Sequence, residues 1–98
     1  MTVKKLKSLL IHQQDIFIID IREPYEYENG SICKVNIPMA EIMNRISEIP
    51  KEKSVIIYCK SGKRSRSLKY MLEKIHNYDN LHHLEGGYKA WEEKMEVA

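Results

Sequence analysis

One cysteine, Cys59, is followed closely by a glycine and a cluster of cations in the stretch YCKSGKRSRS at residues 58–67. The stretch has no acidic residue. Its cations are Lys60, Lys63, Arg64 and Arg66. A thiol beside positive charge ionises more readily than a free thiol, and the thiolate is the nucleophilic form. These residue types indicate either a reactive cysteine facing an anion site or a structural cysteine beside a solvated basic segment.

The residues around Cys59 predict how the sulfur is presented. The run SVIIYC at 54–59 is typical of a buried strand, and a helical apolar pattern begins near Ser65. A tight turn from a strand into a helix directs backbone N–H groups inward and adds the positive end of the helix. This favours the reactive interpretation. The residues expected to form an anion-binding cradle around the sulfur are Lys60, Ser61, Gly62, Lys63, Arg64 and Ser65.

Other segments predict the framework that carries this loop. Strands are predicted at 16–21, 34–38, 54–59 and 80–84, and helices at 3–12, 39–49 and 65–78, with a last helix after Gly86-Gly87. Alternating strands and helices indicate an α/β fold with a largely parallel sheet. Ligands of such sheets bind outside the carboxyl ends of the strands, which is where Cys59 falls.

The composition limits the classes of function. The chain has 98 residues, 43% of them apolar and 31% charged, which is typical of one globular domain. A net charge of +2 gives no global case for nucleic-acid binding. No apolar run is long enough for a signal peptide or a membrane span, so we expect a cytoplasmic chain with free thiols at Cys33 and Cys59. We expect a monomer, and no metal site because the histidines lack ligand spacing with the cysteines.

Four segments, taken together and in order, resemble signatures of the single-domain rhodaneses, a family of sulfurtransferases. The segments are DIREPYEYENGSI at 20–32, VNIP at 35–38, CKSGKRS at 59–65 and LEGGYKAW at 84–91. The resemblance implies one rhodanese-like domain over residues 1–98, with a five-stranded, mostly parallel sheet flanked by helices on both faces. One departure is Ser31, which stands where the family usually has histidine. We expect little effect on catalysis, because that position resembles a structural one.

The resemblance also implies a reaction. The Cys59 thiolate would attack the outer sulfur of an anionic donor such as thiosulfate, form a persulfide and release sulfite. Cyanide, a thiol or a protein would then accept the sulfur, which is covalent catalysis in two steps. Backbone N–H groups of residues 60–65 would stabilise the persulfide, and the neighbouring cations would attract the donor. No cofactor is implied, and a sulfur-carrier protein or a cysteine desulfurase is compatible as a partner.

Two other functions could use the same residues. A cysteine-dependent phosphatase or arsenate reductase would have an arginine six positions after the nucleophile, and this chain has Ser65 there. An arginine one position away is poorly placed for bidentate binding of phosphate. The six-residue loop of the family, here Cys59 to Arg64, goes with sulfur transfer. The third function is a non-catalytic rhodanese-like binding module, which the presence of Cys59 makes the least favoured.

Some further residues have both a structural and a functional interpretation. Asp20 and Arg22 are interpreted as scaffold residues that bond to loop backbone and to Glu26 in a partly buried ion pair, the alternative being that Asp20 is a carboxylate that orients the loop. Cys33 is interpreted as a small buried side chain, the alternative being a second redox cysteine. Gly86-Gly87 predicts a tight turn with positive φ before the last helix.

Overall fold

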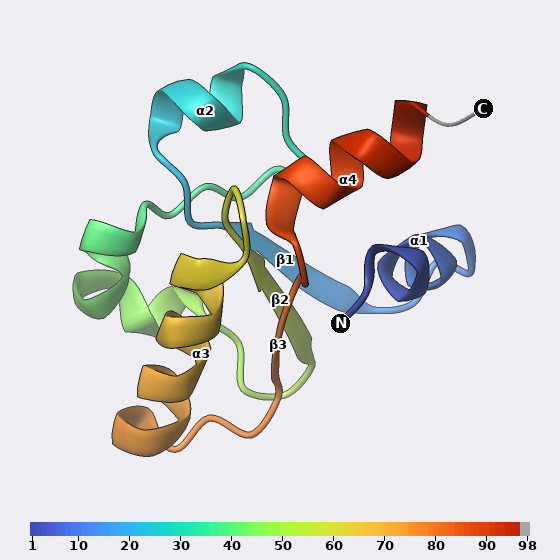
Figure 1. Ribbon diagram of the computed structural model, residues 1–98. Helices are drawn as coiled ribbons and strands as arrows, with labels where there is room; N and C mark the ends of the chain where they lie inside the picture. The colour runs from blue at the N-terminus through green and yellow to red at the C-terminus, as the bar shows by residue number, and fades with distance from the viewer. Residues whose placement is uncertain (97–98) are drawn as a thin grey trace.

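The computed structural model of the protein describes residues 1–96, in which helices and strands alternate along the chain (Figure 1). The elements are α1 (Val3–Ile11), β1 (Ile16–Asp20), α2 (Pro24–Glu28), the 3-10 helix η1 (Met39–Glu48), β2 (Ser54–Tyr58), α3 (Lys63–His76), β3 (Leu81–His83) and α4 (Gly87–Glu96). The α/β class predicted from the sequence is confirmed.

The three strands form a parallel sheet in the order β1-β2-β3. Both long strands are runs of β-branched residues, which suit strands that are covered on both faces. The register pairs Ile16 with Ser54 and Asp20 with Tyr58, so that β1 and β2 end side by side. Cys59 therefore follows directly from the carboxyl edge of the sheet.

The expectation of five strands is wrong for residues 1–96, whose sheet has three. The segment predicted as a short strand before Pro38 makes a single bridge, in which Asn36 lies beside Asp20. The N–H of Ile37 donates to the carbonyl of Asp20 at 2.9 Å. The next N–H on this side of the segment, that of Met39, donates to the carbonyl of Ile21 at 3.0 Å, and the pairing extends no further because the chain turns into η1 at Met39.

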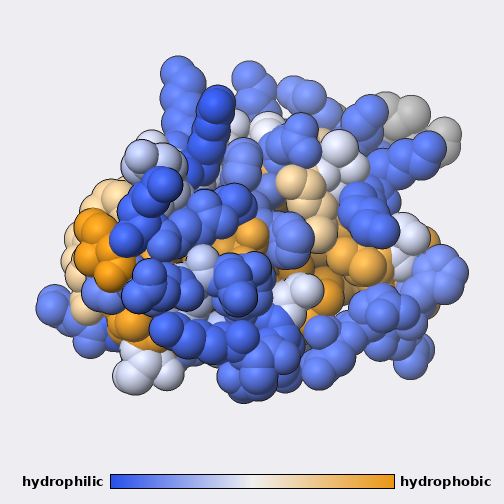
Figure 2. Space-filling view, turned by 90° about the horizontal axis from the view of Figure 1, so that it is seen from below, coloured by the Kyte–Doolittle hydropathy of each residue, from blue (hydrophilic) through white to orange (hydrophobic). Residues whose placement is uncertain are grey.

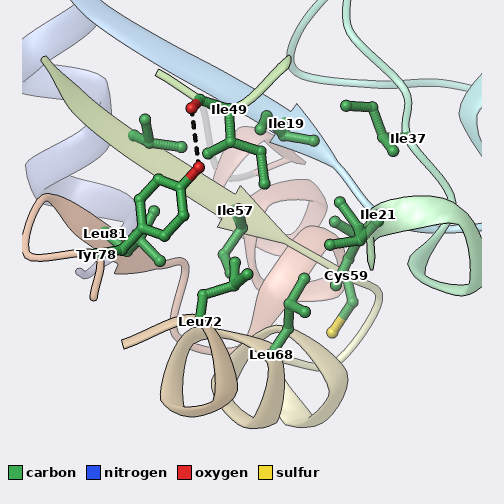
Figure 3. Close-up of a cluster of buried hydrophobic side chains, with 12 residues drawn as sticks. Ile19, Ile21, Ile37, Ile49, Ile57, Cys59, Leu68, Leu72, Tyr78 and Leu81 are labelled. Carbon is green, nitrogen blue, oxygen red and sulfur yellow. Dashed lines mark hydrogen bonds between the residues drawn. The ribbon is translucent and has the colours of Figure 1, made fainter. Parts of the chain in front are cut away.

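Helices cover both faces of the sheet, as expected, and each face has its own apolar core (Figure 1). Successive side chains of a strand point to opposite faces. On β2, Ile57 points to the face that packs against α3, and Cys59 beyond it lies in the same core, beside Leu68 (Figure 3). We call this the α3-side core. Ile56 and Tyr58 point to the opposite face and belong to a second core with α1 and α4, the α4-side core.

The helix after the reactive loop begins earlier than its apolar pattern indicated. The sequence placed its start near Ser65, and the structure places it at Lys63, with Gly62 as the N-cap. Gly62 has a φ of 98°, in the left-handed region, and allows the chain to turn from strand to helix within a few residues. The loop between β2 and α3 is consequently short, and Ser65 lies in the first turn of α3.

Hydrophilic side chains cover most of the surface seen from below, with apolar ones exposed between them (Figure 2). The large exposed apolar side chains of α3 are Tyr70, Met71 and Ile75. Within residues 1–96, no helix has the length and apolar content that are required to cross a bilayer.

Candidate active site

The sulfur of Cys59 lies at the N-terminal end of α3, enclosed by the loop that precedes this helix. The backbone N–H of Gly62 donates to Sγ at 3.1 Å, and Oγ of Ser65 lies 3.6 Å from Sγ. Figure 3 shows Sγ directed toward the start of α3, next to Leu68. Cys59 has 0% of its surface exposed, so the loop covers the sulfur completely.

The loop lowers the pKa of Cys59 although the residue is buried. Burial by itself raises the pKa of a thiol, because it disfavours the charged thiolate. Hydrogen bonds from Ser65, Gly62 and Ser61 outweigh burial here, and the pKa of Cys59 falls below its ordinary value. The positive end of α3, a helix of 14 residues, acts in the same direction. The arrangement therefore favours a thiolate that accepts several N–H groups.

The N-terminus of α4 fixes the orientation of the loop. The N–H of Tyr88 donates to the carbonyl of Cys59 at 2.8 Å, and the N–H of Lys89 donates to that of Lys60 at 3.0 Å. In a trans peptide the C=O and the N–H point in opposite directions. Holding these two carbonyls on α4 therefore turns the N–H groups of Lys60 and Ser61 away from α4, and that of Ser61 contributes to the hydrogen bonding of Sγ.

Gly87 allows α4 to approach the loop this closely. A Cβ atom on Gly87 would lie 2.5 Å from the carbonyl oxygens of both Cys59 and Lys60, and its φ is +62°. Sequence reasoning predicted a positive φ at this turn and missed the pair of hydrogen bonds that follows it. The adjacent Gly-Gly-Tyr motif was the signal that could have indicated the contact.

A buried ion pair supports this contact on the side of the sheet that α4 covers. Asp20 and Arg22 are 0% and 4% exposed, with Nη2 of Arg22 2.7 Å from Oδ2 of Asp20. The hydroxyl of Tyr58 donates to the same carboxylate at 2.8 Å. The guanidinium of Arg22 lies 4.2 Å from the ring centroid of Tyr88, whose N–H holds the loop. The pair thus has the scaffold position that the sequence indicated.

The ion pair differs in one detail from the sequence-based interpretation. Arg22 was expected to bond to Glu26, and it donates instead to the carbonyl of Gly30 at 2.6 Å. Glu26 faces Arg64, with 3.9 Å between Nη2 and Oε1. The side chain of Arg64 is therefore directed toward α2, and Ser65, at the position where a phosphatase has its arginine, is buried against Sγ.

The remaining cations of the loop line two surface depressions on either side of it. Lys60 borders a depression of about 210 Å³ between α2 and α4, together with Arg22 and Glu26. Lys63 and Arg66 border a second depression, of about 240 Å³, beside β3. Its other lining residues are Ser61, Gly62, His83, Glu85 and Gly86. The six predicted cradle residues thus form the short loop and the first turn of α3, where the N–H groups of Ser61, Gly62 and Ser65 act on Sγ and the cations lie at the rim.

His83 is a residue at this rim to which sequence reasoning gave no role. Its Nδ1 is buried and has no hydrogen-bond partner among residues 1–96. Burial lowers the pKa of His83, and the positive N-terminus lowers it further. Both effects favour the neutral form of the ring. Adjacent histidines at the end of a strand gave no signal that one of them borders the reactive loop.

Cys33 is separated from Cys59 by the sheet. It packs against the α4-side core, whereas Cys59 belongs to the α3-side core. Its Sγ donates to the carbonyl of Val35 at 3.3 Å, and both cysteines are free thiols. Burial raises the pKa of Cys33, and the nearby carboxylate of Asp20 also raises it. Cys33 was expected to be a small buried side chain, and the structure shows it partly buried against the α4-side core.

Known proteins resemble this chain over almost its whole length. The family model of the rhodanese-like domain matches residues 2–94. A protein named sulfurtransferase from Allochromatium vinosum is 38% identical over 90 residues, which cover 90% of this chain and 82% of the relative. The thiosulfate sulfurtransferase GlpE of Coxiella burnetii is 30% identical over 84 residues, 84% of this chain and 77% of that protein. A rhodanese-related protein from Thermoplasma volcanium has a structure with a TM-score of 0.85 at 26% identity, covering 96% of this chain and 90% of that one.

Proposed function

Because the chain belongs to the rhodanese-like domain family, we propose that it is a sulfurtransferase that carries a sulfane sulfur as a persulfide on Cys59. The observation that carries the proposal is the position of Sγ, which accepts the N–H of Gly62 at 3.1 Å at the start of α3. This environment favours the thiolate, and a preformed thiolate attacks sulfur without help from a general base.

Thiosulfate is the donor that we propose for the first half of the reaction. The Cys59 thiolate attacks the outer sulfur, the S–S bond of thiosulfate breaks, and sulfite leaves with the bonding electron pair. Cys59 then carries a persulfide with one negative charge. The name of the Coxiella burnetii relative and the cations at the rim of the loop, Lys60 and Lys63, support an anionic donor of this kind.

The cradle has a different task in each half of the reaction. Since Sγ is fully covered, the donor sulfur must widen the ring of N–H groups in order to reach it. The added sulfur then fills the widened ring, where the N–H groups of residues 61–65 stabilise its charge. In the second half, a nucleophilic acceptor such as cyanide or a thiol attacks this outer sulfur, and Cys59 leaves as the thiolate.

A reducing, cytoplasmic setting would keep Cys59 free, and a monomer has all the residues that the reaction needs.

The proposal is tested by intact-protein mass spectrometry before and after incubation with thiosulfate. We expect the mass to increase by one sulfur atom and to return to its original value when cyanide is added. The Cys59→Ser variant is the control and should gain no mass. An unchanged mass of the wild-type protein with both thiosulfate and polysulfide would overturn the proposal, and so would a gain that persists in Cys59→Ser.

A further inference from the structure

The exposed side of α3 continues outward from the reactive loop and is built unlike an ordinary solvated helix face. Its side chains recur at intervals of three and four residues, so they lie on one face of the helix. They are Lys63, Arg66, Ser67, Tyr70, Met71 and Lys74. We call this set the α3 outer face. Five of the six, all except Lys74, line a depression of about 550 Å³.

Apolar groups on this face are exposed without a partner in the folded domain. The side chain of Tyr70 is 63% exposed, and that of Met71 is 38% exposed. A single exposed apolar residue is normal on a protein surface, whereas several that share a depression are typical of an interaction site. Tyrosine, methionine and arginine are also the residue types that are enriched at protein–protein interfaces.

The charge of the α3 outer face has one sign. Lys63 begins the face beside the loop, and Nζ of Lys74 lies 5.7 Å from the ring centroid of Tyr70 at its far end. The only acidic residue of α3 is Glu73, which is bound to Lys69 at 2.8 Å beside this face. A face with several cations and no free carboxylate complements an acidic partner.

The length of the face indicates the size of its ligand. A helix rises about 1.5 Å per residue, so Lys74 lies roughly 16 Å along the axis from Lys63. A small ion such as thiosulfate or cyanide, bound at the loop, would not extend along the helix as far as Lys74. Three cations with two large apolar side chains between them are also too few charges for a nucleic-acid interface, which is much more positive.

We propose that the α3 outer face docks an acidic segment of a sulfur-accepting protein and thereby brings a cysteine of that protein to the Cys59 persulfide. The inference depends on the proposed function for the chemistry of transfer, but not for the docking itself. The acceptor thiol loses its proton to solvent, and its thiolate attacks the outer sulfur of Cys59. The persulfide S–S bond breaks, its electron pair stays on Sγ of Cys59, and the acceptor becomes the persulfide.

The test uses two synthetic peptides of equal length, each with one cysteine, in which the acidic residues of the first are lysines in the second. Transfer from thiosulfate-charged protein is followed by mass spectrometry at low salt. We expect kcat/KM to be about tenfold higher for the acidic peptide, and salt to reduce the difference. Equal values for the two peptides would overturn the proposal.

The double variant Tyr70→Ala/Lys74→Glu locates the effect on the α3 outer face. Both side chains are exposed and distant from the loop, so we expect wild-type turnover with cyanide and about a tenfold loss with the acidic peptide. Lys5→Glu makes the same change of charge at an exposed site on α1 and should leave transfer to both acceptors unchanged. If Lys5→Glu lost as much transfer to the acidic peptide as the double variant, the net charge of the protein rather than the α3 outer face would determine the rate, and the proposal would be overturned.

Two further measurements separate the possible failures. Fluorescence anisotropy of the labelled acidic peptide measures docking to protein that carries no persulfide, so a Tyr70-dependent signal would support the face even if neither thiosulfate nor polysulfide adds sulfur to Cys59. That combination would overturn only the proposed function. A single-stranded RNA oligonucleotide is added as a competitor, and tighter Tyr70-dependent binding of the RNA than of the acidic peptide would overturn the inference in favour of a nucleic-acid partner.

Discussion

The two cysteines of this chain lie on opposite faces of one sheet and differ in the groups that surround their sulfur atoms. Sγ of Cys59 accepts the N–H of Gly62 at 3.1 Å, at the positive end of a helix. Sγ of Cys33 donates to the carbonyl of Val35 at 3.3 Å. The pKa of Cys59 is lowered, despite burial, by hydrogen bonds from the loop, and the pKa of Cys33 is raised, chiefly by burial.

The hydrogen bonds that surround Cys59 affect its pKa more than its burial does, so exposure alone does not indicate which thiol is reactive. Cys59 is completely buried and Cys33 only partly so, which on exposure alone would make Cys33 the more reactive thiol. A carbonyl accepts hydrogen bonds, so the bond to Val35 requires that Cys33 keep its proton. The hydroxyl of Tyr58, 3.9 Å from this sulfur, donates its proton to Asp20. Burial therefore prevails at Cys33 over the hydrogen bonds that lower its pKa, and the thiolate is disfavoured.

Replacement of each cysteine by serine should give the largest effect. We expect Cys59→Ser to remain folded and to lose thiosulfate:cyanide turnover by at least about 10³-fold, because a hydroxyl cannot carry the persulfide sulfur. Cys33→Ser should retain turnover within about threefold, since a hydroxyl can also donate to the carbonyl of Val35. Steady-state sulfite release measures both. A loss of turnover in Cys33→Ser that matches the loss in Cys59→Ser would mean that the two thiols act together.

The Cys59 environment could largely be predicted from the sequence, because it is local. One buried strand run, a glycine and a helical pattern within 58–67 were enough to place the sulfur and its cradle. The error at the start of α3 has a local cause as well. The start near Ser65 was predicted from an apolar pattern whose first residue is Leu68, whereas the helix begins at Lys63, directly after Gly62 with its left-handed conformation.

The Cys33 environment and the support by α4 could not be predicted, because both depend on contacts between distant segments. Cys33 meets the hydroxyl of Tyr58 across 25 residues, and Tyr88 meets the carbonyl of Cys59 across the whole of α3 and β3. Periodicity and turn chemistry describe neighbours along the chain and carry no information about such pairs. The single bridge at Asn36, where a strand was predicted, has the same origin, since tertiary placement decides how far pairing extends.

Gly87→Ala should change the Cys59 environment and leave that of Cys33 unchanged. The added Cβ would meet two loop carbonyls at 2.5 Å, so the loop must shift and its N–H groups must move relative to Sγ. We expect turnover to fall by roughly 100-fold, the size of effect associated with a displacement of about 1 Å at a reactive centre. Thermal or urea unfolding should show a loss of stability of about 1–3 kcal/mol from the left-handed alanine.

Gly86→Ala is the matched control for this prediction. Gly86 also has a positive φ, +77°, but an added Cβ would meet the side chain of Ala90 at 2.6 Å instead of the loop. We expect a comparable loss of stability with turnover reduced by only a few-fold. If both variants lost turnover in proportion to stability, α4 would be a general structural support rather than the element that orients the loop peptides.

Ser65→Ala should produce the smallest effect and identify the part of the cradle that lowers the pKa of Cys59. The change removes a hydroxyl 3.6 Å from Sγ and keeps the N–H groups of Ser65 and Gly62, so the pKa of Cys59 should rise toward its ordinary value without reaching it. Only the thiolate reacts, so at a pH below this pKa the rate of persulfide formation should fall, by about threefold to tenfold. The loss should vanish at higher pH, where Cys59 is ionised in both proteins. A pH–rate profile with sub-saturating thiosulfate measures this, and Ser67→Ala, on the exposed side of the same helix, is the control.

An equal loss at every pH would mean that Ser65 acts through the packing of the loop rather than through the thiolate. The contrast between the two cysteines would then depend on the backbone N–H groups and the end of α3 alone.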